Sequence, residues 1–159
     1  MTEPRSVRFD TWRELENQFS ACIGAAQRTL DLFDPDFAPY PLGALDVDTL
    51  LRAFMARGGR LRLALHNPAH IERHYPRFTR LLRDYSHLYE CRRTPTGLRH
   101  LTDSFCIGDG RDLVRRFHSD HARGAASFGE VAETELPQHR FAAIWLESRT
   151  TLQPTISGL

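Results

Sequence analysis

Hydrophobic residues recur along the chain with two periods, one typical of strands and one typical of helices. Alternating positions predict strands over 6–10, 28–34, 60–66, 87–93, 98–107 and 112–118. Helical spacing predicts helices over 12–27, 46–57, 69–85 and 137–148. Strands that alternate with helices and are followed by a group of strands are typical of an α/β fold. We therefore predict a mixed, mostly parallel sheet with helices on both faces.

Several residues mark where the predicted helices begin. Thr11 and Glu14 have the spacing of a capping box at the start of the first helix. Asp46 or Asp48 is expected to cap the second helix. Pro137 is expected in the first turn of the last helix, where a missing N–H costs nothing.

The length of 159 residues predicts one domain. We assign it to residues 1–149 and expect a flexible tail over 150–159. No apolar run approaches the ~18–20 residues of a transmembrane helix, and the first residues do not resemble a signal peptide. Three cysteines without a CxxC pair predict buried thiols in a reducing compartment, so we expect a cytoplasmic protein.

All of the basic residues are arginine, so no lysine amine can act as a nucleophile, base or phosphate ligand. Residues 51–123 hold 15 arginines against 7 acidic residues, whereas 1–50 hold 4 against 9 and 124–159 hold 2 against 4. A basic middle segment points to an anionic ligand. The alternative is a solvated surface on which these arginines pair with the acidic ends.

The segment from Leu98 to Gly110 carries the most informative polar pattern. Because side chains alternate along a strand, one face of this segment would hold small polar groups and a histidine. The polar face comprises His100, Thr102, Ser104 and Cys106, and the other face comprises Leu101, Phe105 and Ile107. We predict that the polar row lines a pocket.

Residues 102–110, which end in Gly108-Asp109-Gly110, resemble one repeat of the phospholipase D-like family. Its signature is His-x-Lys followed after four further residues by Asp, on a strand that enters a turn. Residues 30–34 and 61–65 also resemble the opening of that fold, and the resemblance covers roughly 11–148. It implies a phospholipase D-like α/β repeat from a bacterial branch of the family.

In that family the histidine attacks phosphorus and the lysine neutralises phosphate charge. Here Thr102 and Ser104 stand at the histidine and lysine positions, and Asp109 alone is retained. The resemblance therefore implies a degenerate motif. Because the family pairs two motifs, it also implies a possible homodimer.

We interpret the chain as a non-catalytic phospholipase D-like domain, a pseudo-enzyme that binds an anionic, phosphate-containing ligand or a protein partner. The expected pocket is formed by His100, Thr102, Ser104 and Asp109, with Arg115 or Arg116 nearby. One alternative is a dimeric phosphodiesterase that uses His100 with an arginine, and its catalytic candidates are His100 and Asp109. The other is a nucleic-acid-binding module, which an isoelectric point near 7.9 disfavours.

We expect no metal and no cofactor. His118 and His121, together with Asp120, have the chemistry of zinc ligands. A zinc motif would place its third ligand at a defined spacing, and no such ligand is clear here, which favours a polar turn. His66, His70 and His74 are spaced by four, but Asn67-Pro68 places His66 at the end of a strand. Only His70 and His74 then share a helix, and we expect them to be a surface pair. Residues 123–128 lack the spacing and the lysine of a phosphate-binding loop.

Overall fold

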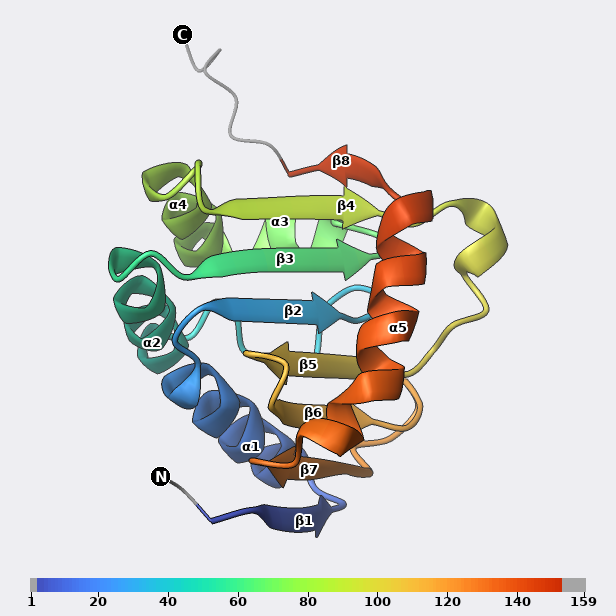
Figure 1. Cartoon of the computed structure of the whole chain (residues 1–159). Helices are drawn as coiled ribbons and strands as arrows, with labels where there is room; N and C mark the ends of the chain where they lie inside the picture. Colours follow the sequence, from blue (N-terminus) through green and yellow to red (C-terminus); the bar gives the residue numbers. More distant parts are fainter. Residues whose placement is uncertain (1–2, 153–159) are drawn as a thin grey trace, which may run out of the picture.

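Eight strands form one mixed sheet in the computed structural model, which describes residues 3–152 (Figure 1). The strands are β1 Arg5–Phe9, β2 Thr29–Phe33, β3 Arg60–Leu65, β4 Tyr89–Arg93, β5 Ser104–Gly108, β6 Asp112–Arg116, β7 Gly124–Phe128 and β8 Arg149–Thr151. Their order across the sheet is β1-β7-β6-β5-β2-β3-β4-β8.

Parallel pairing is confined to the middle of the sheet, where β2 pairs with β3 and β3 with β4. The other five pairs are antiparallel. The expectation of a mostly parallel sheet is therefore wrong. The reason is that β5, β6 and β7 follow one another through short connections, each of which reverses the chain direction. The two edge strands, β1 and β8, also pair antiparallel with their neighbours.

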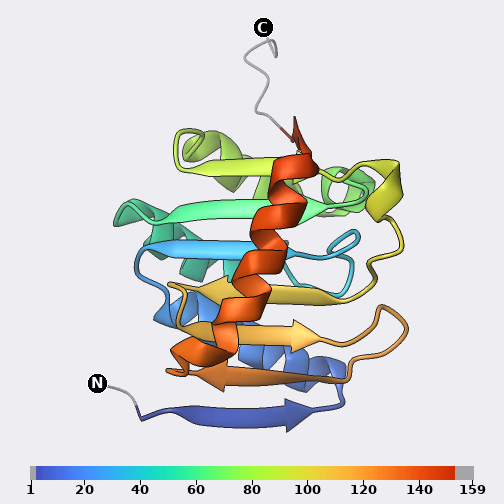
Figure 2. The same ribbon diagram turned by 45° about the vertical axis from the view of Figure 1, so that its right-hand side comes forward.

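The helices form two layers of unequal size. They are α1 Trp12–Ala25, α2 Leu45–Ala56, α3 Ala69–His74, α4 Pro76–Asp84 and α5 Val131–Glu147. Figures 1 and 2 show α5 crossing the front of the sheet, while the other four helices lie behind it. Side chains of β2 alternate between the two faces of the sheet and so contribute to two hydrophobic cores. Leu30 and Leu32 pack in the larger core, and Phe33 packs in the smaller core with α5.

The capping box at the start of α1 is confirmed. The Thr11 hydroxyl accepts a hydrogen bond from the backbone N–H of Glu14 at 3.2 Å and donates one to the Glu14 carboxylate at 2.8 Å. The cap predicted for α2 is wrong. Its N-cap is Ala44, which offers no side-chain acceptor, while Asp46 and Asp48 lie in the first turn.

Proline changes the boundaries of two predicted helices. The helix expected over 69–85 is divided at Tyr75, because Pro76 disfavours the helical conformation in the residue before it. The last helix begins at Val131, and Pro137 lies inside it rather than in its first turn. Thr134, one turn earlier, is bonded through its hydroxyl to the carbonyl of Gly110, so this stretch is anchored to the turn after β5.

Two strands were missed by the sequence patterns. Strand β7 consists mostly of small residues and fills the space between β1 and β6. Strand β8 covers the outer edge of β4 and includes Thr150 and Thr151, which were expected in a flexible tail. The remainder of that predicted tail, 153–159, lies outside the described residues.

The three cysteine thiols are free and buried, as predicted. Cys22 of α1 and Cys106 of β5 approach with their sulfur atoms 3.6 Å apart in the larger core. Within residues 3–152, no helix combines the length and the apolar character that crossing a bilayer requires.

A substitution at Gly124 tests the tight fit of β7. A Cβ atom there would lie 2.0 Å from the Arg115 carbonyl oxygen and 2.6 Å from the Phe9 ring, and the backbone oxygen cannot move aside by changing a rotamer. We expect Gly124→Ala to lower the free energy of unfolding by about 3 kcal/mol, the upper end of typical overpacking costs. Urea unfolding measures this change.

The matched control is Gly97→Ala, because a Cβ atom at Gly97 meets nothing within 4 Å. We expect this variant to unfold within about 0.5 kcal/mol of the parent, as is usual for surface changes. Equal effects of the two substitutions would contradict the pairing of β7 between β1 and β6.

Candidate functional site

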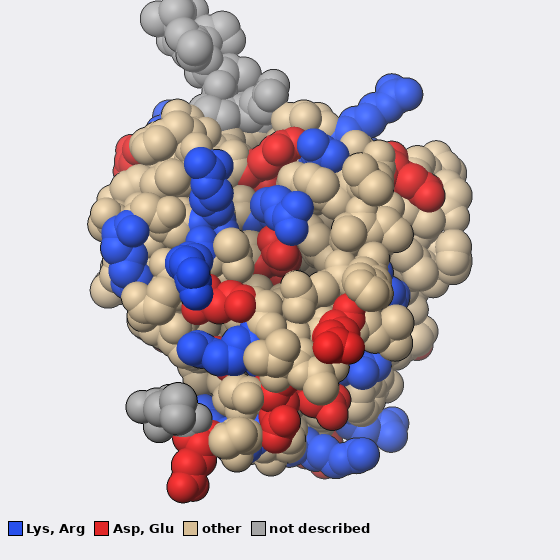
Figure 3. All heavy atoms as spheres, in the orientation of Figure 1, with Lys and Arg blue, Asp and Glu red and all other residues tan. Residues whose placement is uncertain are grey.

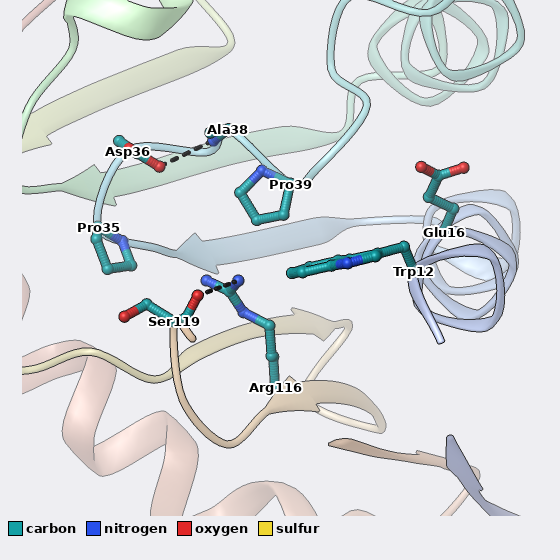
Figure 4. Close-up of a pocket in the computed structure, with 8 residues that line it drawn as sticks. All are labelled: Trp12, Glu16, Pro35, Asp36, Ala38, Pro39, Arg116 and Ser119. Carbon is teal, nitrogen blue, oxygen red and sulfur yellow. Dashed lines mark hydrogen bonds between the residues drawn. The ribbon is translucent and has the colours of Figure 1, made fainter. Parts of the chain in front are cut away.

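A pocket of about 610 Å³ opens at the end of the sheet where β2 and β6 both terminate, beside the first turn of α1 (Figure 4). Its lining comes from α1, from the loop after β2 and from the end of β6. The lining residues are Trp12, Glu16, Pro35, Asp36, Ala38, Pro39, Arg116 and Ser119. This volume falls within the range of small-molecule sites.

The floor of the pocket is a buried ion pair between β6 and the residue that follows β2. Nη2 of Arg116 donates to Oδ1 of Asp34 at 2.8 Å, and the two residues are 3% and 0% exposed. Nε of Arg116 donates to the Ser104 hydroxyl at 3.1 Å. Nη1 makes only a long 3.5 Å contact with the Ser119 carbonyl oxygen, so the guanidinium keeps N–H donors for a ligand.

Asp34 also shapes the wall of the pocket. Its second oxygen accepts hydrogen bonds from the backbone N–H groups of Asp36 at 3.0 Å and Phe37 at 2.6 Å. Phe37 has a φ of +61°, a left-handed conformation that is costly for a bulky side chain. The Tyr75 hydroxyl, within 2.9–3.0 Å of the carbonyl oxygens of Phe37, Ala38 and Tyr40, holds the same loop from the other side.

Burial raises the pKa of the Asp34 carboxyl to about 6. The nearby guanidinium of Arg116 and the two backbone N–H donors act in the opposite direction without cancelling the effect of burial. Burial also raises the pKa of Tyr40, which is 1% exposed. Tyr40 is therefore a neutral donor, and its hydroxyl bonds to Ser104 at 3.1 Å.

Trp12 forms an exposed aromatic wall of the pocket. Its side chain is 45% exposed, and the centroid of its ring lies 5.7 Å from Cζ of Arg116. Figure 4 shows the indole extending from α1 toward the guanidinium, with Glu16 on the same helix beyond it. An aromatic surface and a guanidinium therefore face the same space.

The structure brings together two of the predicted site residues, Ser104 and Arg116. Arg115 is on the opposite face of the sheet, because successive residues of β6 point to opposite sides. There it is exposed, and its Cζ lies 5.2 Å from the centroid of the Phe117 ring. Of the two arginines proposed beside the pocket, only Arg116 lines it.

His100 and Thr102 do not belong to the strand in which the alternating pattern placed them. Strand β5 begins at Ser104, and the residues before it form a short 3-10 turn and a loop. The loop is held by Nε2 of His66, which lies 2.7 Å from the Leu101 carbonyl oxygen. His100 is exposed in this loop and does not line the pocket.

Asp109 lies at the other end of β5, about 17 Å along the strand from Ser104. Its carboxylate accepts hydrogen bonds of 2.8–3.0 Å from the backbone N–H groups of Gln27, Arg28 and Thr29. Partial burial acts to raise the pKa of Asp109, but these donors and Arg111 outweigh it and hold the pKa below its usual value. Asp109 therefore holds the start of β2 against the end of β5 through these hydrogen bonds, and it does not line the pocket.

The charged groups that line the pocket are the guanidinium of Arg116 and the carboxylates of Glu16 and Asp36. A guanidinium with free N–H donors suits an oxyanion, which it can contact through two parallel hydrogen bonds. No histidine or cysteine occurs among the residues that line the pocket. In the part of the chain described, no group of three or more His, Cys, Asp or Glu side chains has the arrangement to hold a metal ion.

The sequence patterns missed Asp34, Trp12, Glu16 and Asp36. Asp34 carried a usable signal, because a charged residue directly after the buried pair Leu32-Phe33 stands at the carboxyl end of a strand, where α/β folds place ligand sites. Trp12 and Glu16 had no such signal, because they fit the amphipathic pattern of a surface helix.

Replacing Asp34 with Asn tests the burial of this carboxyl. A folded-state pKa raised from 3.8 to about 6 contributes stability that is present in full below pH 3.8 and lost as the pH rises to about 6. At about 1.4 kcal/mol per pKa unit, the parent should lose about 3 kcal/mol relative to Asp34→Asn over this interval. Urea unfolding of both proteins at a series of pH values measures the difference.

A difference in unfolding free energy that does not change with pH would contradict the raised pKa. If Asp34→Asn does not fold, the carbon-13 shift of the Asp34 carboxyl in the parent reports the same pKa directly. A titration midpoint at or below about 4, the ordinary range of an aspartate, would then contradict the raised pKa in its turn.

Similar solved structures share this fold. Nuc of Salmonella typhimurium, a phospholipase D family member, is 14% identical with a TM-score of 0.67, over 94% of this chain and 99% of that one. NucT of Helicobacter pylori is 10% identical with a TM-score of 0.61, over 94% and 100%. TrmBL2, an archaeal chromatin protein with a novel mode of DNA binding, is 11% identical with a TM-score of 0.68, over 92% and 54%.

The fold is thus phospholipase D-like, as the sequence resemblance implied. TrmBL2 is a DNA-binding protein, so this fold by itself does not argue against nucleic acid as a partner. No curated protein matches the sequence. A family model described as a domain of unknown function matches residues 11–153, and the chain therefore belongs to the DUF7931 family.

Proposed function

We propose that this chain is a non-catalytic phospholipase D-like domain that binds a small anionic ligand in the pocket beside α1. The observation that carries the proposal is the position of Arg116. Its guanidinium is almost fully buried at the floor of an open pocket and is fixed in orientation by Asp34 and Ser104. A donor group held rigidly in this way binds a ligand with little loss of conformational entropy.

The resemblance to the phospholipase D-like motif supports the same site. Ser104 stands at the lysine position of the motif, and its hydroxyl oxygen accepts hydrogen bonds from the Tyr40 hydroxyl and from Nε of Arg116. The positive charge that the motif takes from lysine is supplied here from the adjacent strand, by Arg116. Arginine binds oxyanions through two donors, so the exchange retains a phosphate-binding group.

Loss of turnover follows from the groups that remain. Thr102, at the histidine position, precedes β5 and does not line the pocket. A hydroxyl is a weak nucleophile unless a base activates it. His100, which the alternative phosphodiesterase would use with an arginine, lies in the exposed loop before β5. The proposal retains a homodimer as a possible assembly, because the resembled family pairs its motifs.

Binding of ethyl phosphate, followed by NMR, tests the proposal. The chain has two tryptophans, and only Trp12 lines the pocket, because Trp145 belongs to α5 and packs against the opposite face of the sheet. We expect the indole N–H signal of Trp12 to shift during titration and that of Trp145 to stay unchanged. Bis(p-nitrophenyl) phosphate should not be hydrolysed above background.

Arg116→Lys should weaken binding about tenfold or more, because a hydrogen bond to a charged group contributes about 1.5–3 kcal/mol. Arg115→Lys is the matched control, since Arg115 precedes Arg116 on β6 and faces the other side, and it should leave binding unchanged. Equal loss in both variants, or no shift of the Trp12 signal, would refute the pocket as an anion site. Hydrolysis of the diester would refute the non-catalytic assignment.

A second candidate is nucleic-acid binding at a separate surface around Phe117. Two shallow hollows of about 300 and 450 Å³ share Arg8 and Phe117, and Arg123 or Arg115 lines one hollow each. Phe117 is 42% exposed and could stack on a base, while the arginines could contact phosphates. Against this, Figure 3 shows basic and acidic groups interspersed on the α5 side of the molecule rather than a continuous basic surface.

Fluorescence anisotropy with a labelled single-stranded oligonucleotide tests this candidate. If it holds, affinity should fall steeply with added salt, because each phosphate contact releases counterions. Arg8→Ala should reduce the salt slope by about 1, whereas Arg60→Ala, an exposed arginine that lines neither hollow, should not change it. Binding that is insensitive to salt, or no binding at low salt, would exclude the surface.

A further inference from the structure

The pocket carries charges of both signs, and they are not evenly paired. Its buried cation, Arg116, already has the carboxylate of Asp34 as a partner at 2.8 Å. The lining also includes Glu16 and Asp36, and within residues 3–152 neither carboxylate lies within 4.0 Å of a basic group. The charge of the lining that lacks a partner is therefore negative.

A simple anion would meet opposing effects in this pocket. The free N–H groups of Arg116 attract it, while the carboxylates of Glu16 and Asp36 repel it across a space that exceeds the size of a single oxyanion. A ligand with a positive group next to its anionic group would turn that repulsion into attraction. The lining is thus complementary to both charges at once.

The position of Trp12 strengthens the preference for a cation at the rim. Its indole is 45% exposed, and Glu16 follows it one helical turn later on α1. Figure 4 shows both side chains extending from the same helix on the side of the pocket away from Ser119. The face of an indole attracts an ammonium group, and a nearby carboxylate adds to this attraction.

We propose that the ligand of this pocket is a small zwitterion, whose anionic group contacts Arg116 and whose ammonium group lies between Trp12 and Glu16. The inference rests on the proposed function, since it uses the same contact with Arg116. It adds the second charge of the ligand and the residues that recognise this charge. The chemical class is an amine joined by a short linker to a phosphate or a similar oxyanion.

Two ligands that differ only in the ammonium group test the inference. O-phosphoethanolamine and ethyl phosphate share the phosphate and the two-carbon chain, and ethanolamine supplies the ammonium alone. Titration of the full chain at neutral pH, followed by the indole signal of Trp12, should give a dissociation constant about tenfold lower for O-phosphoethanolamine than for ethyl phosphate. Ethanolamine should bind more weakly than either.

Glu16→Gln should reduce this preference by about threefold and leave ethyl phosphate no weaker than in the parent. Glu16 is exposed and its side chain makes no hydrogen bond within residues 3–152, so its replacement does not endanger folding. The matched control is Glu135→Gln, an exposed glutamate of α5 on the other side of the sheet, which should leave the preference unchanged.

The outcomes separate this inference from the proposed function. Equal affinity for the two phosphates, or a preference that survives Glu16→Gln in full, overturns the zwitterion while the anion site stands. Ethanolamine binding as tightly as O-phosphoethanolamine identifies a cation site and overturns both. Absence of binding by all three compounds also overturns both. Tighter binding of O-phosphoethanolamine than of ethyl phosphate, with the preference reduced in Glu16→Gln and kept in Glu135→Gln, supports the inference.

Discussion

The buried ion pair between Asp34 and Arg116 is the contact on which this end of the molecule depends. Each charge would be costly to bury alone, and removing one partner of such a pair typically costs about 3–5 kcal/mol. Further hydrogen bonds hold both partners in place: Arg116 bonds to Ser104, and Asp34 accepts two backbone N–H groups. It joins β6 to the end of β2 across the first residue of β5.

The same pair determines the form of the pocket. One carboxylate oxygen of Asp34 positions the guanidinium at the floor, and the other holds the loop that forms a wall. The strained backbone of Phe37 persists because this contact and the Tyr75 hydroxyl fix the loop from two sides. Asp34 thus positions two of the three segments that line the pocket, the end of β6 and the loop after β2.

The sequence predicted those parts of the fold in which local pattern and tertiary structure agree. The helix after Thr11 and the strands ending near Phe33 and Leu65 have hydrophobic patterns that burial reinforces. Strand β7 was missed because Gly-Ala-Ala-Ser-Phe has little β-propensity, and its small residues are explained only by the neighbouring chain at Gly124.

The candidate site was predictable only in part, because it depends on register and on distant residues. The alternating pattern of residues 98–107 predicted one strand that included His100 and Thr102. In the structure these two residues lie in a loop held by His66, and the strand begins after them. Alternation did place Arg115 and Arg116 on opposite faces. No local pattern could show that Asp34 would contact Arg116. The two residues come together only because β5 lies between β2 and β6 in the sheet and pairs with both.

The placement of β1 at one edge of the sheet has a consequence for how the chain can fold. Within residues 3–152 its only partner strand is β7, which lies near the other end of the sequence, so their pairing closes a very long loop. Contacts of this kind form late and slow the folding of a domain. During synthesis, β6 would present an unpaired edge with Val114 beside it until Gly124–Phe128 had emerged. Until β7 docks, this edge is open to pairing with a strand of another chain, which favours aggregation in that interval.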